Sequence, residues 1–164
     1  MTSLLCLPIK AAALFVLIWQ VSLVLPSASA EAQGFDALRG AWRGTGQLRL
    51  ASGRTERLRC RAYYNPKESG RRLGMAVRCA SSSYKFELRS KLTAKGNRVS
   101  GTWEERSFNA SGRAFGSLRP GRLALTATGS IRASLLVSFS RNRQTVRLSS
   151  ATGEFRRLVL TLRK

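Results

Sequence analysis

The chain has no histidine, and only eight of its 164 residues are acidic, with Asp36 the one aspartate. The missing imidazole excludes Ser-His and Cys-His nucleophile pairs, histidine acid-base catalysis and the usual zinc sites. The only adjacent carboxylates, Glu104 and Glu105, lie in a predicted strand, where neighbours point to opposite faces and cannot act together on one substrate. We expect these two carboxylates to pair with nearby arginines. The sequence therefore predicts a protein that is not an enzyme and that has no cofactor or metal.

Long hydrophobic runs are also scarce, and the one that is present lies near the start of the chain. Residues 11–25 carry no charge, follow Lys10 and precede the small-x-small sequence Ala28-Ser29-Ala30. This run is too short to span a bilayer, and the pattern is typical of a signal peptide cleaved after Ala30. We expect residues 31–164 to form a single periplasmic or secreted domain with no transmembrane segment. A retained membrane anchor is the alternative.

Acidic residues are heavily outnumbered by basic ones. The sequence has 29 lysines and arginines, a formal net charge of +21, and loss of Lys10 with the signal peptide leaves +20. Arginine accounts for 23 of the basic residues, and its planar guanidinium binds phosphate, sulfate and carboxylate through two contacts at once. A charge of this size predicts attraction to polyanions.

Cysteine is rare as well, and only Cys60 and Cys79 remain after residue 30. If Ser69-Gly70 forms a two-residue hairpin turn, the ladder on either side places Cys60 directly opposite Cys79. Opposed α-carbons lie about 4.5 to 5.5 Å apart, which is within disulfide range, and export favours oxidation. We therefore predict a disulfide that stabilises the fold by about 3 kcal/mol in the chain-entropy model. Two free buried thiols are the alternative.

Apolar and polar residues alternate with a period of two through most of residues 40–163, which is typical of half-buried strands. Short turn sequences such as Lys95-Gly96-Asn97 separate these stretches, and short connections join antiparallel neighbours. We predict an all-β fold, an antiparallel up-and-down meander of about 8–10 strands that closes into a barrel and so removes exposed edges. A two-sheet sandwich is the alternative. Residues 35–39 are predicted to form a short N-terminal helical turn.

A Gly-x-Trp sequence, Gly40-Ala41-Trp42, opens the first predicted strand, and basic residues occur on the last. In these features the chain resembles the calycin superfamily of lipocalins and their relatives. The resemblance implies a calycin-like barrel in which Trp42 packs under a basic residue and closes the base. The basic residue would be Arg156, Arg157 or Arg163. The chain also resembles small exported β-barrel proteins of unknown function from alphaproteobacteria.

Two classes of function remain open, and the first uses the barrel interior. There the protein binds a small apolar or amphipathic ligand, and arginines at the rim attract an anionic headgroup. The side chains predicted to line this interior are Trp42, Tyr64, Tyr84, Phe86 and Trp103; for the two tryptophans, core packing is the alternative. Other residues predicted to point inward are small and either leave a cavity or let the barrel close tightly: Gly44, Gly46, Ala62, Gly101, Ala127 and Ala133.

The second class of function uses the outer surface as a module that binds polyanions such as lipopolysaccharide, exopolysaccharide or nucleic acid. Arg59, Arg61, Tyr63 and Arg78 share the face of the predicted hairpin opposite the cysteines. An aromatic ring beside cationic groups suits sugars and bases. The alternative is a solvated face on a purely structural or interaction protein. The sequence does not indicate an oligomeric state.

Overall fold

The computed structural model describes residues 34–164, and the signal peptide predicted for residues 1–30 lies outside them. The elements are η1 (Phe35–Leu38), β1 (Gly40–Leu50), β2 (Thr55–Lys67), β3 (Arg72–Ala80), β4 (Lys85–Lys95), β5 (Arg98–Glu105), β6 (Ala110–Arg119), β7 (Arg122–Gly129), β8 (Ala133–Phe139), β9 (Arg143–Ser150) and β10 (Phe155–Arg163). Within the described residues, no helix is long and apolar enough to cross a membrane.

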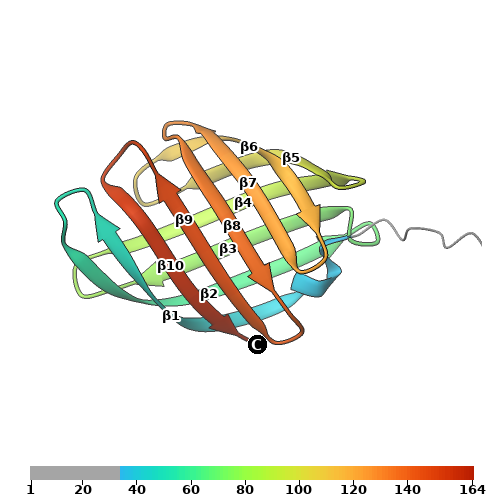
Figure 1. The fold of residues 1–164 in the computed structure, drawn as a ribbon, viewed down its shortest axis with the longest axis horizontal. Coiled ribbons are helices and arrows are strands. Elements are labelled where there is room, and N and C mark those ends of the chain that lie inside the picture. The colour runs from blue at the N-terminus through green and yellow to red at the C-terminus, as the bar shows by residue number, and fades with distance from the viewer. Residues whose placement is uncertain (1–33) are drawn as a thin grey trace, which may run out of the picture. The chain divides into compact units, whose positions relative to one another are not determined.

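The strands form one closed antiparallel barrel. Each strand pairs with its neighbours in the sequence, and β1 pairs with β10 (Figure 1). The predicted all-β meander of about 8–10 strands is therefore confirmed with ten, and the sandwich alternative is wrong. The predicted helical turn is the 3-10 turn η1, at Phe35–Leu38.

The hairpin of β2 and β3 has the register predicted from its turn. Ser69 and Gly70 both have positive φ, 52° and 77°, and the Arg71 amide donates to the Glu68 carbonyl at 3.1 Å. Two central residues with positive φ suit the twist of a tight hairpin. Cys60 lies opposite Cys79 with α-carbons 4.1 Å apart, and the two form a disulfide inside the barrel, each 3% exposed.

One end of the barrel is packed shut beneath η1, and we call it the base. The Trp42 indole is fully buried there and donates to the Leu38 carbonyl at 2.7 Å, which fixes the ring against the turn. The other fully buried side chains of the base are mostly large and apolar and include Phe35, Leu38, Leu73, Leu92, Leu118, Leu123, Leu160 and Leu162.

The basic partner of Trp42 differs from the expectation. The resemblance implied Arg156, Arg157 or Arg163, but the Lys164 ammonium lies 5.0 Å from the centre of the Trp42 ring. Side chains alternate along β10, so Leu162 points inward and the exposed Arg163 points outward. The residue after the strand is therefore the one that reaches the tryptophan.

Tyr64 and Gln144 form a polar pair inside the base. The Tyr64 hydroxyl donates to the Gln144 side-chain oxygen at 3.0 Å, and burial raises the pKa of Tyr64. The Gln144 amide nitrogen has no hydrogen-bond partner among the described residues, although the side chain is fully buried. Tyr64 is thus held in the core by packing and by this bond.

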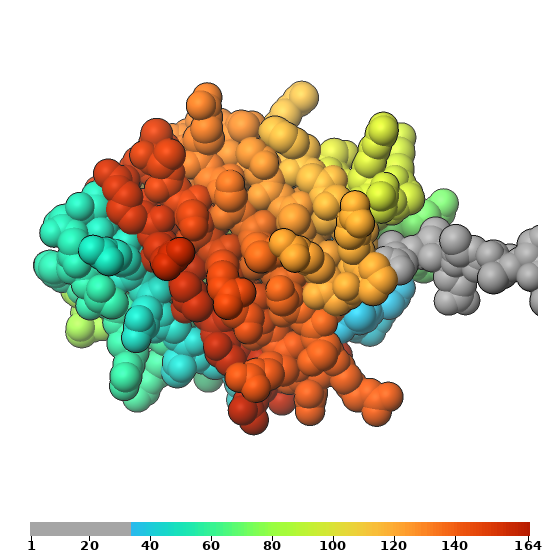
Figure 2. Space-filling view, viewed as in Figure 1, coloured from blue at the N-terminus to red at the C-terminus, as the bar shows by residue number. Residues whose placement is uncertain are grey.

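Two glycines allow β1 to close against β10. A Cβ atom at Gly44 would collide with the Thr161 carbonyl oxygen, and one at Gly46 with the Val159 carbonyl oxygen. Because both positions lack a side chain, they let the backbones of β1 and β10 approach closely where the barrel closes. Figure 2 shows the red C-terminal strand lying against the blue-green N-terminal part of the barrel.

We predict that Gly44→Ala lowers the free energy of unfolding by about 1–3 kcal/mol, because the added methyl forces the two backbones apart. The matched control is Gly74→Ala in β3, where the nearest atom to a new Cβ is the Asn65 carbonyl oxygen at 3.9 Å. This control should be neutral or slightly stabilising. Urea unfolding followed by circular dichroism measures both, and equal effects would contradict the role of Gly44.

Candidate functional site

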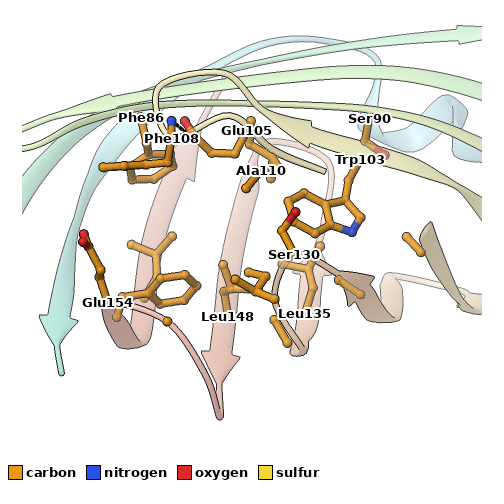
Figure 3. Close-up of a pocket in the computed structure, with 18 of the residues that line it drawn as sticks. Phe86, Ser90, Trp103, Glu105, Phe108, Ala110, Ser130, Leu135, Leu148 and Glu154 are labelled. Atoms are coloured by element: carbon orange, nitrogen blue, oxygen red, sulfur yellow. Dashed lines mark hydrogen bonds between the residues drawn. The ribbon is translucent and has the colours of Figure 1, made fainter. Parts of the chain in front are cut away.

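The end of the barrel opposite the base is hollow. A cavity of about 470 Å³ opens there, walled chiefly by inward side chains of β4 to β10 and by the loops that join strands at this end (Figure 3). Most of its lining side chains are apolar. This volume lies within the usual range of small-molecule sites, about 300–1,000 Å³.

Small residues explain why this half of the barrel is hollow. The register places Gly101, Ala114, Ala127, Ala133 and Ser150 directly opposite one another across β5 to β9. The three alanines of this row line the cavity. Small inward residues therefore have two different roles. The glycines of β1 allow the barrel to close against β10, and the alanines of β6 to β8 leave room for the cavity.

Three of the five aromatics predicted to line the interior face the cavity: Tyr84, Phe86 and Trp103. The Trp103 indole donates to the Thr128 carbonyl at 3.1 Å, which holds the ring against the wall. The Tyr84 ring lies 5.7 Å from the ring of Phe108, which is 52% exposed in the loop between β5 and β6. The aromatic rings thus extend from the wall to the mouth.

Trp42 and Tyr64 do not line the cavity, which corrects the expectation for these two residues. Both point inward as the alternation predicts, but they lie at the opposite end of the barrel. There Trp42 packs under η1 and Tyr64 is bonded to Gln144. Core packing, the alternative for Trp42, is what the structure has.

Glu105 anchors the loop that covers one side of the mouth. Its two carboxylate oxygens accept hydrogen bonds from the backbone amides of Glu87, at 2.7 Å, and Phe108, at 2.6 Å. Glu104 points outward, so the two neighbours do face opposite ways. The expected pairing of both carboxylates with arginines is wrong, because neither forms a salt bridge among the described residues and Glu105 binds backbone amides instead.

The mouth is acidic, although the protein is strongly basic. The Tyr84 hydroxyl donates to the Glu154 carboxylate at 2.6 Å, and this bond raises the pKa of Tyr84. At the rim, hydrogen bonds from Arg54 and Ser83 hold the pKa of the Glu56 carboxyl below its usual range. Glu105 and Glu154 line the cavity, whereas no lysine or arginine does so in the described part of the chain.

No metal centre is formed by residues 34–164, in which no three cysteine or carboxylate side chains gather. The serine hydroxyls that line the cavity donate to backbone carbonyls. Ser90 donates to the Thr102 carbonyl at 2.9 Å and Ser130 to the Ser111 carbonyl at 3.1 Å. The lining is therefore mostly apolar, and its polar groups near the mouth include Glu105, Asn109 and the Tyr84–Glu154 pair.

The four residues predicted to contact a polyanion lie together on the outer face of β2 and β3. Arg59, Arg61 and Arg78 line a shallow hollow there with Arg43 and Lys85, and Tyr63 is 42% exposed beside it. Arg78 is bonded to Glu87 at 3.1 Å. Whether these residues contact a polyanion stays a prediction.

Several residues of the mouth were not predicted to line the interior, namely Glu105, Phe108, Glu154 and Phe155. Phe108 and Glu154 lie in loops, where the period-two alternation that marks an inward side chain is lost. Phe155 is out of phase with the inward Leu158, because the register of β10 shifts beside it. Glu105 had a usable signal, because it continues the inward alternation that includes Trp103 in β5.

These features define a class of protein, a closed antiparallel barrel of ten strands with a packed base and a hollow end. Among solved structures the chain is similar to Rv2717c from M. tuberculosis, with a TM-score of 0.62 and 10% identity over 78% of this chain and 92% of that one. It is also similar to the S-type phycobiliprotein lyase CPES from Guillardia theta, with a TM-score of 0.54 and 12% identity over 79% of this chain and 89% of that one.

The likeness to these two structures shows a shared barrel fold. No protein-family model matches the chain, and no curated protein sequence matches it either. The resemblance to exported alphaproteobacterial proteins stays a prediction.

We predict that Glu154→Gln lowers the pKa of Tyr84, because a neutral amide no longer favours the protonated phenol. Ultraviolet difference titration of the tyrosines measures this shift, and Tyr84→Phe identifies the step that belongs to Tyr84. An unchanged titration curve in Glu154→Gln would show that the carboxylate does not bind the phenol.

Proposed function

We propose that the protein binds a small apolar or amphipathic ligand inside its barrel. The observation that carries this proposal is the apolar cavity of about 470 Å³, open at one end of a barrel whose other end is packed shut. Packing at the base means that a ligand enters and leaves by the mouth. Aromatic and aliphatic walls supply the apolar contact area on which such sites depend.

The polar end of the ligand is uncharged or cationic. Glu105 already accepts two backbone amides, so its charge is partly satisfied. Glu154 accepts the Tyr84 hydroxyl through one oxygen, which leaves the other to accept a donor from a ligand. The expected attraction of an anionic headgroup by rim arginines is not favoured. Carboxylates and no arginines line the described cavity, and Arg54 at the rim is paired with Glu56.

The proposed activity is binding rather than catalysis. One similar structure is named a lyase, but at 12% identity the likeness concerns the fold alone. In the described cavity the serine hydroxyls are bonded to backbone carbonyls, and no histidine exists to activate a nucleophile. The Cys60–Cys79 disulfide supports the proposed periplasmic or secreted location, since disulfides persist in oxidising compartments.

Filling the cavity should weaken binding. Ala127→Phe places a ring in the hollow half of the barrel, and we expect it to lower the affinity for the uncharged fluorophore N-phenylnaphthylamine by at least about tenfold, or 1.4 kcal/mol. Fluorescence titration measures this affinity. Ala133→Leu, in the same row of small residues, should act in the same direction.

The matched control is Thr126→Phe, which adds the same ring on the outer side of β7, opposite Phe115. It should leave the affinity unchanged. Circular dichroism melting curves confirm that each variant is folded. Equal affinities for the original protein and for both folded cavity variants would exclude the interior as the binding site.

A further inference from the structure

Five arginines form a continuous row across the outside of the barrel. The register sets Arg143 opposite Arg163, Arg163 opposite Arg43, Arg43 opposite Arg61 and Arg61 opposite Arg78. The row therefore crosses the adjacent strands β9, β10, β1, β2 and β3, and all five side chains are exposed. With strands about 4.8 Å apart, it extends for about 19 Å. We call it the arginine row.

The arginine row brings like charges together at a cost. Like charges directly opposite one another destabilise a sheet. Of the five arginines in the row, only Arg78 has a carboxylate partner among the described residues. This partner is Glu87 at 3.1 Å, whose carboxylate is shared with Arg89 at 2.7 Å. The other four arginines face only one another and solvent. A ligand with several negative charges in a line would remove this repulsion.

The curvature of the barrel determines the shape of that ligand. Five of the ten strands make up half of the circumference, so the row winds around the molecule. A flat bilayer touches a convex barrel along only a narrow strip and cannot reach the whole row. A flexible linear polymer can follow it, and the shallow hollow lined by Arg43, Arg61 and Arg78 lies in its path.

The side chains beside the arginine row indicate what kind of polymer it binds. A second row, of hydroxyls, runs next to it across β9, β10 and β1, where Thr145 lies opposite Thr161 and Thr161 opposite Thr45. Sites for single-stranded nucleic acid need several aromatic rings on which bases stack. Tyr63 is the one aromatic among the neighbouring outward positions of the described strands. Several charges and hydroxyls with a single ring beside them suit a chain of sugars better than a chain of bases.

We propose that the arginine row binds one chain of an acidic polysaccharide that carries a carboxylate on each sugar. The guanidinium groups bind successive carboxylates through paired hydrogen bonds, and the threonine hydroxyls bind the sugar hydroxyls. This site is separate from the cavity, because the arginines point outward and none of them lines the interior.

The test compares two triple variants with the same loss of charge. The row variant combines Arg43→Gln, Arg61→Gln and Arg163→Gln, and the control variant combines Arg98→Gln, Arg113→Gln and Arg122→Gln, three exposed residues of β5, β6 and β7. Isothermal titration calorimetry at low salt measures the affinity for short oligogalacturonates. We expect the affinity of the row variant for oligogalacturonate to fall by at least about tenfold, and that of the control variant to fall by less than about threefold.

Several results would overturn the proposal. The first is an equal loss of affinity for oligogalacturonate in the two variants, and the second is no binding of oligogalacturonate by the unaltered protein. The third is that the unaltered protein binds oligothymidylate or phosphatidylglycerol vesicles more tightly than oligogalacturonate. The row variant should still bind N-phenylnaphthylamine as the unaltered protein does. This second measurement separates failure of the arginine row from failure of the cavity.

Discussion

The pairing of β1 with β10 is the constraint on which the rest of the structure depends. It joins the two ends of the meander and removes the exposed edges that an open sheet would have. Trp42 of β1 is buried in the base, and Leu48 of β1 and Leu158 of β10 line the cavity. On the outside, the same pairing places Arg43 opposite Arg163. Base, cavity and arginine row would all be lost if the barrel opened there.

Side-chain size along the barrel axis divides the interior into two parts. Leucines and aromatics fill the base, whereas alanines and serine leave the other half hollow. The base supplies the buried apolar area that stabilises the fold, and the Cys60–Cys79 disulfide adds a cross-link between neighbouring strands. A well-packed base thus lets the other end remain open without loss of the barrel.

Much of the fold followed from local patterns in the sequence, and the site followed only in part. The period of two shows which face a side chain occupies, and the Ser69-Gly70 turn defines the register of one hairpin. Neither pattern shows how far along the barrel axis a residue lies, so Trp42 and Trp103 were expected to be equivalent and are not. The arginine row depends on the register between β1 and β10, which no turn connects, and so it could not be found before closure was known.

Inside and outside therefore carry opposite chemistry, an apolar cavity with an acidic mouth and an arginine-rich exterior. Native mass spectrometry of the protein purified from the cells that make it, before and after denaturation, tests the central claim of a ligand cavity most directly. We predict an excess mass that is lost on denaturation, because the ligand is held without a covalent bond. The same mass in both samples would contradict a bound ligand.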